Sequence, residues 1–280
     1  MAEVKTAAAK PSSHGSNAGK PKNSNYTIIN LLIIVICFTA AHLVFHFWFG
    51  NAENFRDAER HIPANFLGTV YTGGWVIPIL MSTALVLICF VIERALTVRR
   101  ANGKINNGEF VRKVQFHLAN KNIDAALAEC DKQSGSVGNV MRAGLLKYRE
   151  MTTNNELETE QKILSIQKEI EEATSLELPM LEKNLVFLST IASVATLLGL
   201  FGTVLGMIRA FQAMGQAGAP DAAALANGIS EALINTAIGI GTSAIAIVTY
   251  NYFTTVIDGI TYSIDESGFT LTQSFAANYK

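Results

Sequence analysis

Glu231 is the residue of this chain with the clearest capacity for chemistry. It is the one carboxylate within the apolar stretch ISEALINTAIGIGTSAIAIVTYN, which is long enough to form a membrane-spanning helix. A carboxylate in the hydrocarbon region is costly unless it faces a polar cavity or a partner, and such residues mark ion pathways. Glu231 is therefore the first candidate for a functional residue, and ion movement is the chemistry that it indicates.

Hydroxyl and amide side chains accompany Glu231 along this helix. At about 100° per residue, several of them share its sector. The residues in that sector are Asn235, Thr242 and Thr249. Thr236 and Ser243 lie further round.

The preceding apolar segment, LSTIASVATLLGLFGTVLGMIRAF, has a similar pattern. One helical sector carries hydroxyls, and the adjacent sector carries glycines. The hydroxyl residues are Ser189, Ser193, Thr196 and Thr203, and the glycines are Gly199, Gly202 and Gly206.

Two interpretations of these strips remain open. Small residues permit close helix packing, and hydroxyls can bond to backbone carbonyls, which is the more common role of a single Ser or Thr. Alternatively, the strips face a shared pore and offer a wettable path. The combination of strips on two successive spans with one carboxylate favours the pore.

Glu231 itself is compatible with two environments, because it lies near the outer end of its span. It is either a hydrated interfacial carboxylate or a buried group that relays protons. Arg209, at the outer end of the preceding span, is the nearest counter-charge. We favour a snorkelling interfacial anchor as the role of Arg209.

Four segments are long and apolar enough to cross a bilayer, which needs about 20 residues per helix. They cover about residues 27–49, 74–92, 184–207 and 229–252. The first could be a secretory signal, but its leading region is long and no A-x-A site follows, so we expect a retained span.

Lysine and arginine placement predicts the orientation of these spans. Basic residues gather in the N-terminal tail and again after the second span, at Arg94, Arg99, Arg100 and Lys104. The connections near 50–72 and 215–226 lack a basic excess. We therefore expect both termini in the cytoplasm.

These segments define the expected organisation, which is an all-α membrane protein with four transmembrane helices and a helical cytoplasmic region. In that region Ile163, Ile166, Ile170 and Ala173 form one apolar stripe, with a cap expected at Asn154 or Asn155. The expected parts are a disordered cytoplasmic tail (1–26), a first span (27–49), a periplasmic loop (50–73), a second span (74–92), a cytoplasmic helical region (93–183), a two-helix core (184–257) and a cytoplasmic C-terminal tail (258–280).

Residues 178–257 resemble the MotA/TolQ/ExbB proton-channel family, most closely its ExbB and TolQ branch. The resemblance is carried by GLFGTVLG at 199–206 and ISEALINTAIG at 229–239, in this order on successive spans. By resemblance, Glu231 matches the family's pore-associated glutamate, and Thr203 and Thr236 match its two pore-lining threonines. The predicted proton pathway is thus Glu231, Thr203 and Thr236, with Ser193, Thr196, Asn235 and Thr242 as further pore-lining candidates.

The resemblance implies a homopentameric stator in the bacterial inner membrane. Its implied partner is an ExbD-like or TolR-like protein, whose single span is enclosed by the pentamer and carries an aspartate. Proton flow would energise outer-membrane transport through a TonB-like transducer. A TolQ-like or motility-type motor and a non-conducting scaffold remain alternatives, and protons are preferred to sodium on the resemblance alone.

Two features depart from the family pattern. Ala195-Thr196 stands where the family commonly has Ala-Pro, so we expect a straighter third span because no proline kinks it. The span at 27–49 is one helix extra relative to the usual three-span layout, and we expect it to pack as a peripheral anchor.

Other signals are weaker. His42 and His46 lie one helical turn apart, a spacing that can bind a metal, but the aromatic residues around them indicate an interfacial belt. We expect two of the three cysteines, Cys37 and Cys89, to be small buried residues in apolar segments, and Cys130 to be a reduced thiol. We expect no metal, no cofactor, no enzymatic activity and no nucleic-acid binding.

Overall fold

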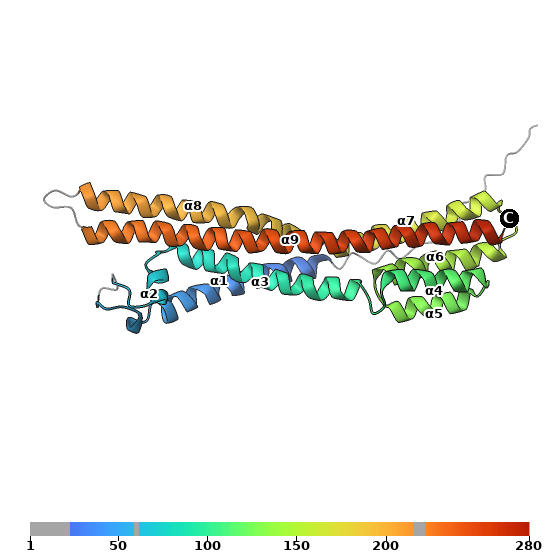
Figure 1. Cartoon of the computed structure of the whole chain (residues 1–280), viewed down its shortest axis with the longest axis horizontal. Coiled ribbons are helices and arrows are strands. Elements are labelled where there is room, and N and C mark those ends of the chain that lie inside the picture. Colours follow the sequence, from blue (N-terminus) through green and yellow to red (C-terminus); the bar gives the residue numbers. More distant parts are fainter. Residues whose placement is uncertain (1–22, 59–61, 216–221, 280) are drawn as a thin grey trace, which may run out of the picture.

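The computed structural model describes residues 23–58, 62–215 and 222–279, with side chains from residue 28 onward, and these residues are almost entirely helical. They form an elongated rod in which α9 (Ala222–Asn278) runs along nearly the whole length (Figure 1). No strand occurs in the described ranges; the β-pairing there is an isolated bridge between Phe55 and Pro63.

Four helices in the described part of the chain are long and apolar enough to cross a membrane. They are α1 (Asn23–Leu43) with its π-helical continuation η1 (Val44–Phe49), α3 (Val76–Ala101), α8 (Leu185–Gly215) and α9. The prediction of an all-α protein with four spans is confirmed.

The helices extend well past the predicted spans. α3 continues to Ala101, and residues 258–278, expected as a tail, continue α9. Apolar length reports only the part of a helix that lies in hydrocarbon. The extensions are helical because they pack against other helices, which a hydropathy pattern does not register.

The extension of α9 and the helices between α3 and α8 together form what we call the amphipathic bundle, at the end of the rod away from Gly215 and Ala222. Its members are α4 (Asn107–Ala119), α5 (Ile123–Gln133), α6 (Ser136–Thr153), α7 (Thr159–Glu182) and the C-terminal part of α9. Ile166 and Ile170 are buried as the predicted stripe requires, and Tyr148 of α6 meets Phe275 of α9 edge to face at 4.9 Å.

The start of α7 differs from the prediction. Glu158 caps the helix, in a reciprocal pair with Gln161, and the helix begins at Thr159. Asn154 instead accepts hydrogen bonds from the backbone N–H groups of Glu156 and Leu157. Asn side chains favour turns as well as caps, so the asparagine pair alone did not locate the helix start.

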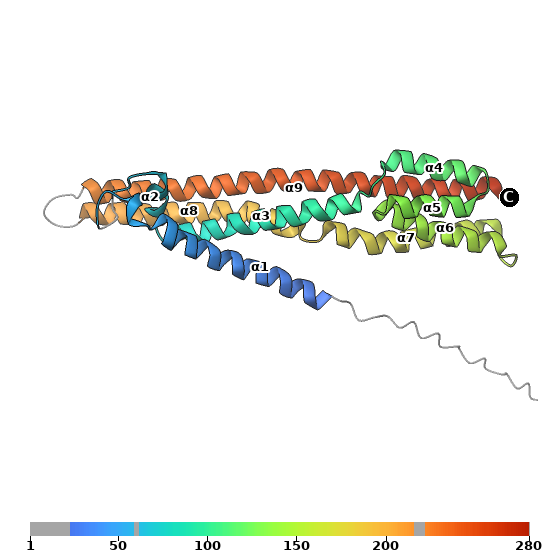
Figure 2. The ribbon, with the colours of Figure 1, turned by 90° about the horizontal axis from the view of Figure 1, so that it is seen from below.

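The first span lies at the edge of the membrane half, packed against α3 (Figure 2). The sulfurs of Cys37 and Cys89 lie 3.6 Å apart across this contact. Cys130 is buried in the amphipathic bundle, where burial raises the pKa of its thiol to about 12. The cysteines therefore act as packed thiols, as the sequence predicted.

The connection between the first two spans is ordered where it is described. It contains η2 (Ala52–Asn54) and α2 (Phe66–Tyr71). Tyr71 stacks on Phe45 at 4.7 Å and meets Phe55 edge to face at 5.5 Å. These aromatic contacts hold the start of α3 against η1, and so position the residues from Gly73 onward.

α8 and α9 form the most extensive helix pair, and their backbones approach closely. A Cβ at Gly206 would lie 2.7 Å from the backbone nitrogen of Ala232, and one at Gly239 would lie 2.7 Å from the carbonyl oxygen of Ala195. Glycines permit this approach because membrane helices associate through close packing rather than through a hydrophobic driving force. The glycine sector of α8 is therefore a packing surface against α9.

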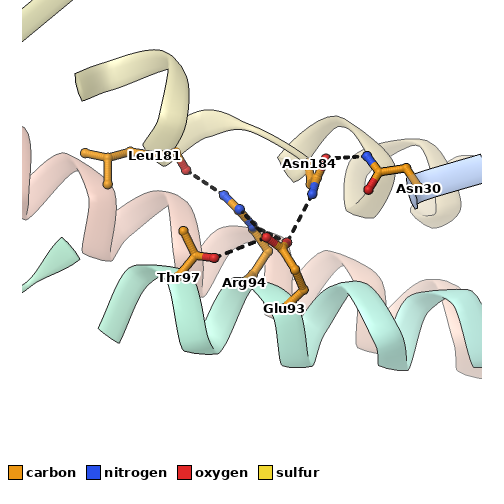
Figure 3. Close-up of polar contacts among 6 residues, drawn as sticks. All are labelled: Asn30, Glu93, Arg94, Thr97, Leu181 and Asn184. Atoms are coloured by element: carbon orange, nitrogen blue, oxygen red, sulfur yellow. Dashed lines mark hydrogen bonds and ion pairs between the residues drawn. The ribbon is translucent and has the colours of Figure 1, made fainter. Parts of the chain in front are cut away.

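Where the membrane half meets the amphipathic bundle, a polar junction joins α1, α3 and α7 (Figure 3). Arg94 of α3 is buried, and it donates to both carboxylate oxygens of Glu93 and, at 2.9 Å, to the carbonyl of Leu181 in α7. Asn184, between α7 and α8, donates to Glu93 at 3.2 Å and accepts from Asn30 of α1 at 2.9 Å. The junction connects the first span and the second span to the point where the amphipathic bundle enters the membrane half.

A pair of glycines on α9 tests the packing of α8 and α9. We expect Gly239→Ala to destabilise the protein by about 1–3 kcal/mol, because its methyl group meets backbone atoms that cannot move aside. Gly241 has no atom within 4 Å of its would-be Cβ, so Gly241→Ala is expected to be neutral or to stabilise by up to about 1 kcal/mol. Thermal unfolding in detergent measures both, and equal losses would contradict the packing described above.

Candidate functional site

Glu231 is buried and forms an ion pair with Arg209. The guanidinium nitrogen Nη1 donates to both carboxylate oxygens, at 2.6 and 2.7 Å. The side chain of Glu231 is 6% exposed, whereas that of Arg209 is 47% exposed. The pair links the last part of α8 to the first part of α9, so the carboxylate is enclosed by protein rather than free in water.

The start of α3 covers this ion pair. Gly74 has a φ of +77°, which favours glycine, and a Cβ there would lie 2.5 Å from Oε1 of Glu231 and 3.1 Å from Nη1 of Arg209. Any side chain at this position would displace the pair. Gly74 is thus a residue of the site that the sequence analysis missed.

Asn235 lies one turn after Glu231 and is fully buried. Its amide nitrogen donates to the carbonyl of Gly73 at 2.9 Å, which ties α9 to the start of α3. Its oxygen Oδ1 is the one buried side-chain polar atom in the described ranges that has no hydrogen-bond partner. A buried acceptor without a donor is costly, so Oδ1 is available to accept one further hydrogen bond.

Thr203 and Thr236 face each other across the α8–α9 interface. Their hydroxyls are hydrogen-bonded to each other, and each also lies 3.1 Å from a carbonyl oxygen of its own helix, Gly199 for Thr203 and Ala232 for Thr236. Each hydroxyl has one proton, so one of them donates across the interface while the other donates to a carbonyl. Further along, the hydroxyl of Ser243 bonds to the carbonyl of Ala192. These hydroxyls therefore serve helix packing in the single chain.

The remaining candidates separate into two groups. Thr242 is buried on α9, on the same side as Glu231 and Asn235. Ser193 and Thr196 are exposed on the surface of α8, away from the ion pair. A single chain thus brings together Thr203 with Thr236, and Glu231 with Arg209, but it does not gather all seven predicted residues around one cavity.

Arg209, expected as a snorkelling interfacial anchor and as the nearest counter-charge, has a half-exposed side chain and is paired with Glu231. The signal in the sequence was the position of the two charges, near the facing ends of two apolar segments joined by a short connection. Helices joined in this way pack antiparallel, so residues near the connection on both helices come to the same level.

The two histidines of the first span lie beside an apolar groove of about 390 Å³ between α1, α2 and α3. His42 donates through Nδ1 to the carbonyl of Phe38, and His46 is exposed. Within the described ranges no group of three metal-ligating side chains occurs. Gly74 borders both this groove and the ion pair.

Comparison with known proteins places Arg209, Glu231, Asn235 and the two threonines, but not Gly74 or the histidines, in a segment that matches a known family. Residues 133–266 match the model of the MotA/TolQ/ExbB proton channel family. The chain is 29% identical over 192 residues to the Tol-Pal system protein TolQ of Haemophilus influenzae, covering 66% of this chain and 80% of that protein. It is 33% identical over 123 residues to TolQ of Pseudomonas aeruginosa (44% of this chain, 53% of that protein) and 28% identical over 201 residues to the biopolymer transport protein ExbB of Neisseria gonorrhoeae (70% and 87%).

The unequal exposure of the ion pair predicts unequal costs of breaking it. Arg209→Gln leaves a buried carboxylate without its counter-charge, and we expect a loss of about 1–3 kcal/mol. Glu231→Gln leaves a guanidinium that is already half exposed and can turn to water, so the expected loss is less than about 1 kcal/mol. Thermal unfolding in detergent at neutral pH measures both, with Gln212→Ala on the exposed part of α8 as the control. A larger loss for Glu231→Gln would contradict this assignment.

Proposed function

Through residues 133–266 the chain belongs to the MotA/TolQ/ExbB proton channel family, and from this we propose that it is the proton-channel stator subunit of an ion-driven motor in the bacterial inner membrane. The motor uses the proton motive force to energise outer-membrane transport through a TonB-type transducer. Both chain termini lie in the cytoplasm.

The observation that carries this proposal is the buried carboxylate of Glu231 within a membrane-spanning helix of the matched segment. An intramembrane carboxylate is expensive to keep, and it is typical of proton relays. The hydroxyls of Thr203 and Thr236 lie on the same two helices, deeper toward the amphipathic bundle, and Thr242 follows on α9. In the proposed route, protons reach Glu231 and leave along these polar groups.

The pore is completed by further copies and by a partner. Ser193 and Thr196 are exposed on α8, which supports a position where they line a pore shared between copies. We propose a homopentamer that encloses an ExbD-like or TolR-like single-span partner. The membrane potential supplies roughly 2.3 kcal/mol per charge per 100 mV, so a few protons per step are sufficient for mechanical work.

Glu231→Gln tests whether the carboxylate conducts. In liposomes that contain the full chain and its partner, we expect proton uptake driven by a membrane potential to fall at least about tenfold, because an amide cannot take up the proton. Glu182→Gln, an exposed carboxylate at the end of α7, is the matched control and should leave the flux unchanged. Unchanged flux in Glu231→Gln, with the complex intact by native mass spectrometry, would favour the non-conducting scaffold.

A TolQ-type output is the second candidate, favoured by the two TolQ proteins among the relatives. Expression of the chain with its partner in cells that lack either ExbB or TolQ separates the two. We expect restored TonB-dependent uptake in the first background. Restored envelope integrity in the second background alone would replace the proposed output with the TolQ type.

A further inference from the structure

We propose that Arg209 is the gate of the proton pathway, and that it closes the pathway by holding Glu231 as a carboxylate. This inference rests on the proposed function, since it assigns a role in that same pathway to a residue that the family resemblance did not single out. The structure then represents the closed state of the single chain.

The geometry of the ion pair blocks protonation. Both oxygens of Glu231 accept from one guanidinium nitrogen, at 2.6 and 2.7 Å. A proton added to either oxygen would neutralise the anion that the guanidinium binds, and it would leave the guanidinium charge unpaired beside a neutral acid. Arginine keeps its proton at all relevant pH values, so it cannot relieve this conflict by deprotonation. Proton uptake therefore requires the guanidinium to move away.

Arg209 can move away, but Glu231 cannot. The arginine side chain is about half exposed and has exposed neighbours, Ile208 and Phe211, on the outer turn of α8. Its guanidinium can therefore turn to water or to another anion. Glu231 is only 6% exposed and lies directly against Gly74, where an added Cβ would come within 2.5 Å of its oxygen Oε1, so it is confined where the arginine is not. Opening the pair thus strands the carboxylate in a buried site, where the neutral acid is the more stable form.

The site already contains a hydrogen-bond acceptor, Oδ1 of Asn235, for the O–H group of protonated Glu231. Asn235 lies four residues after Glu231, so both side chains are on the same face of α9. Its Oδ1 is buried without a donor, and its amide nitrogen is committed to the carbonyl of Gly73. In the open state the new O–H of Glu231 donates to this oxygen, directly or through one water. The atom that is unsatisfied in the closed state is satisfied in the open one.

The proton balance of the gate is simple. A proton from water on the outer side binds the carboxylate after the guanidinium leaves, and it departs along the pathway before the guanidinium returns. Arg209 carries the same charge throughout and transfers no proton. It is therefore a gating residue rather than a member of the relay.

The gate is tested by measuring whether substitution of Arg209 increases proton leak. Substitution of an arginine with a purely structural role would not increase it. The full chain is reconstituted in liposomes together with its single-span partner, and internal pH is followed with a dye under a potassium diffusion potential. We expect Arg209→Gln to raise proton entry about tenfold above the unsubstituted chain, because the counter-charge that holds the carboxylate is gone. Arg209→Lys keeps the charge but loses the planar geometry, so about a threefold rise is expected. Gln212→Ala, one turn along α8, should change nothing.

Two double variants complete the test. The leak of Arg209→Gln should vanish in Arg209→Gln/Glu231→Gln, and it should weaken in Arg209→Gln/Asn235→Leu, which lacks the acceptor. If Arg209→Gln assembles but leaks no more than the unsubstituted chain, the gate is refuted. If it does not assemble, the absence of a rise in Arg209→Lys refutes it equally.

The gate and the proposed function fail in different ways. A leak that persists in Arg209→Gln/Glu231→Gln means that protons bypass Glu231, which overturns the pathway itself. Loss of driven flux in Glu231→Gln without any leak in the Arg209 variants preserves the pathway and overturns only the gate.

Discussion

The close approach of α8 and α9 is the constraint on which the rest of the membrane half depends. At Gly206 and Gly239 the space that a Cβ would occupy is already filled by backbone atoms of the opposite helix. Helices in lipid gain little from hydrophobic association, so contact at this distance is a principal source of their pairing. Because the backbones touch, short side chains can reach across, and the hydroxyls of Thr203 and Thr236 meet.

The same approach determines where the charges can lie. An antiparallel pair in close contact puts Arg209 and Glu231 at one level, where a bulkier interface would hold them apart. The start of α3 then closes the site from the side, because Gly74 brings backbone rather than a side chain against the carboxylate. A buried charge is tolerated only with a partner and satisfied hydrogen bonds. The ion pair meets this requirement for Glu231, while Oδ1 of Asn235 is left without a partner.

The continuity of α9 links this site to the amphipathic bundle. A helix of 57 residues extends about 85 Å, and its first part carries Glu231 while its last part packs against α4, α6 and α7. The polar junction around Arg94 provides a second connection, from α3 to the end of α7. The Glu231–Arg209 ion pair is therefore connected to the amphipathic bundle through α9, and α3 is connected to α7 through the hydrogen bonds of Arg94.

The extra first span is integrated at both ends of the membrane half. Asn30 bonds to Asn184 at the polar junction, and Phe45 stacks on Tyr71 beside the start of α3. Its contacts are with α3 and its connections rather than with the ion pair. In the single chain the first span therefore lies at the edge of the membrane half, in contact with α3.

The sequence by itself determined the class of fold, the four apolar segments, the two-helix core and the candidate carboxylate. These depend on hydropathy and helical periodicity, which are local properties of the chain. Only the tertiary structure decided the partner of Glu231, the cover provided by Gly73 and Gly74, and the unsatisfied oxygen of Asn235. The reason is physical: Arg209 is 22 residues from Glu231, and Gly73 is 162 residues from Asn235. Their contact depends on how three helices pack, and no pattern within a single segment records that geometry.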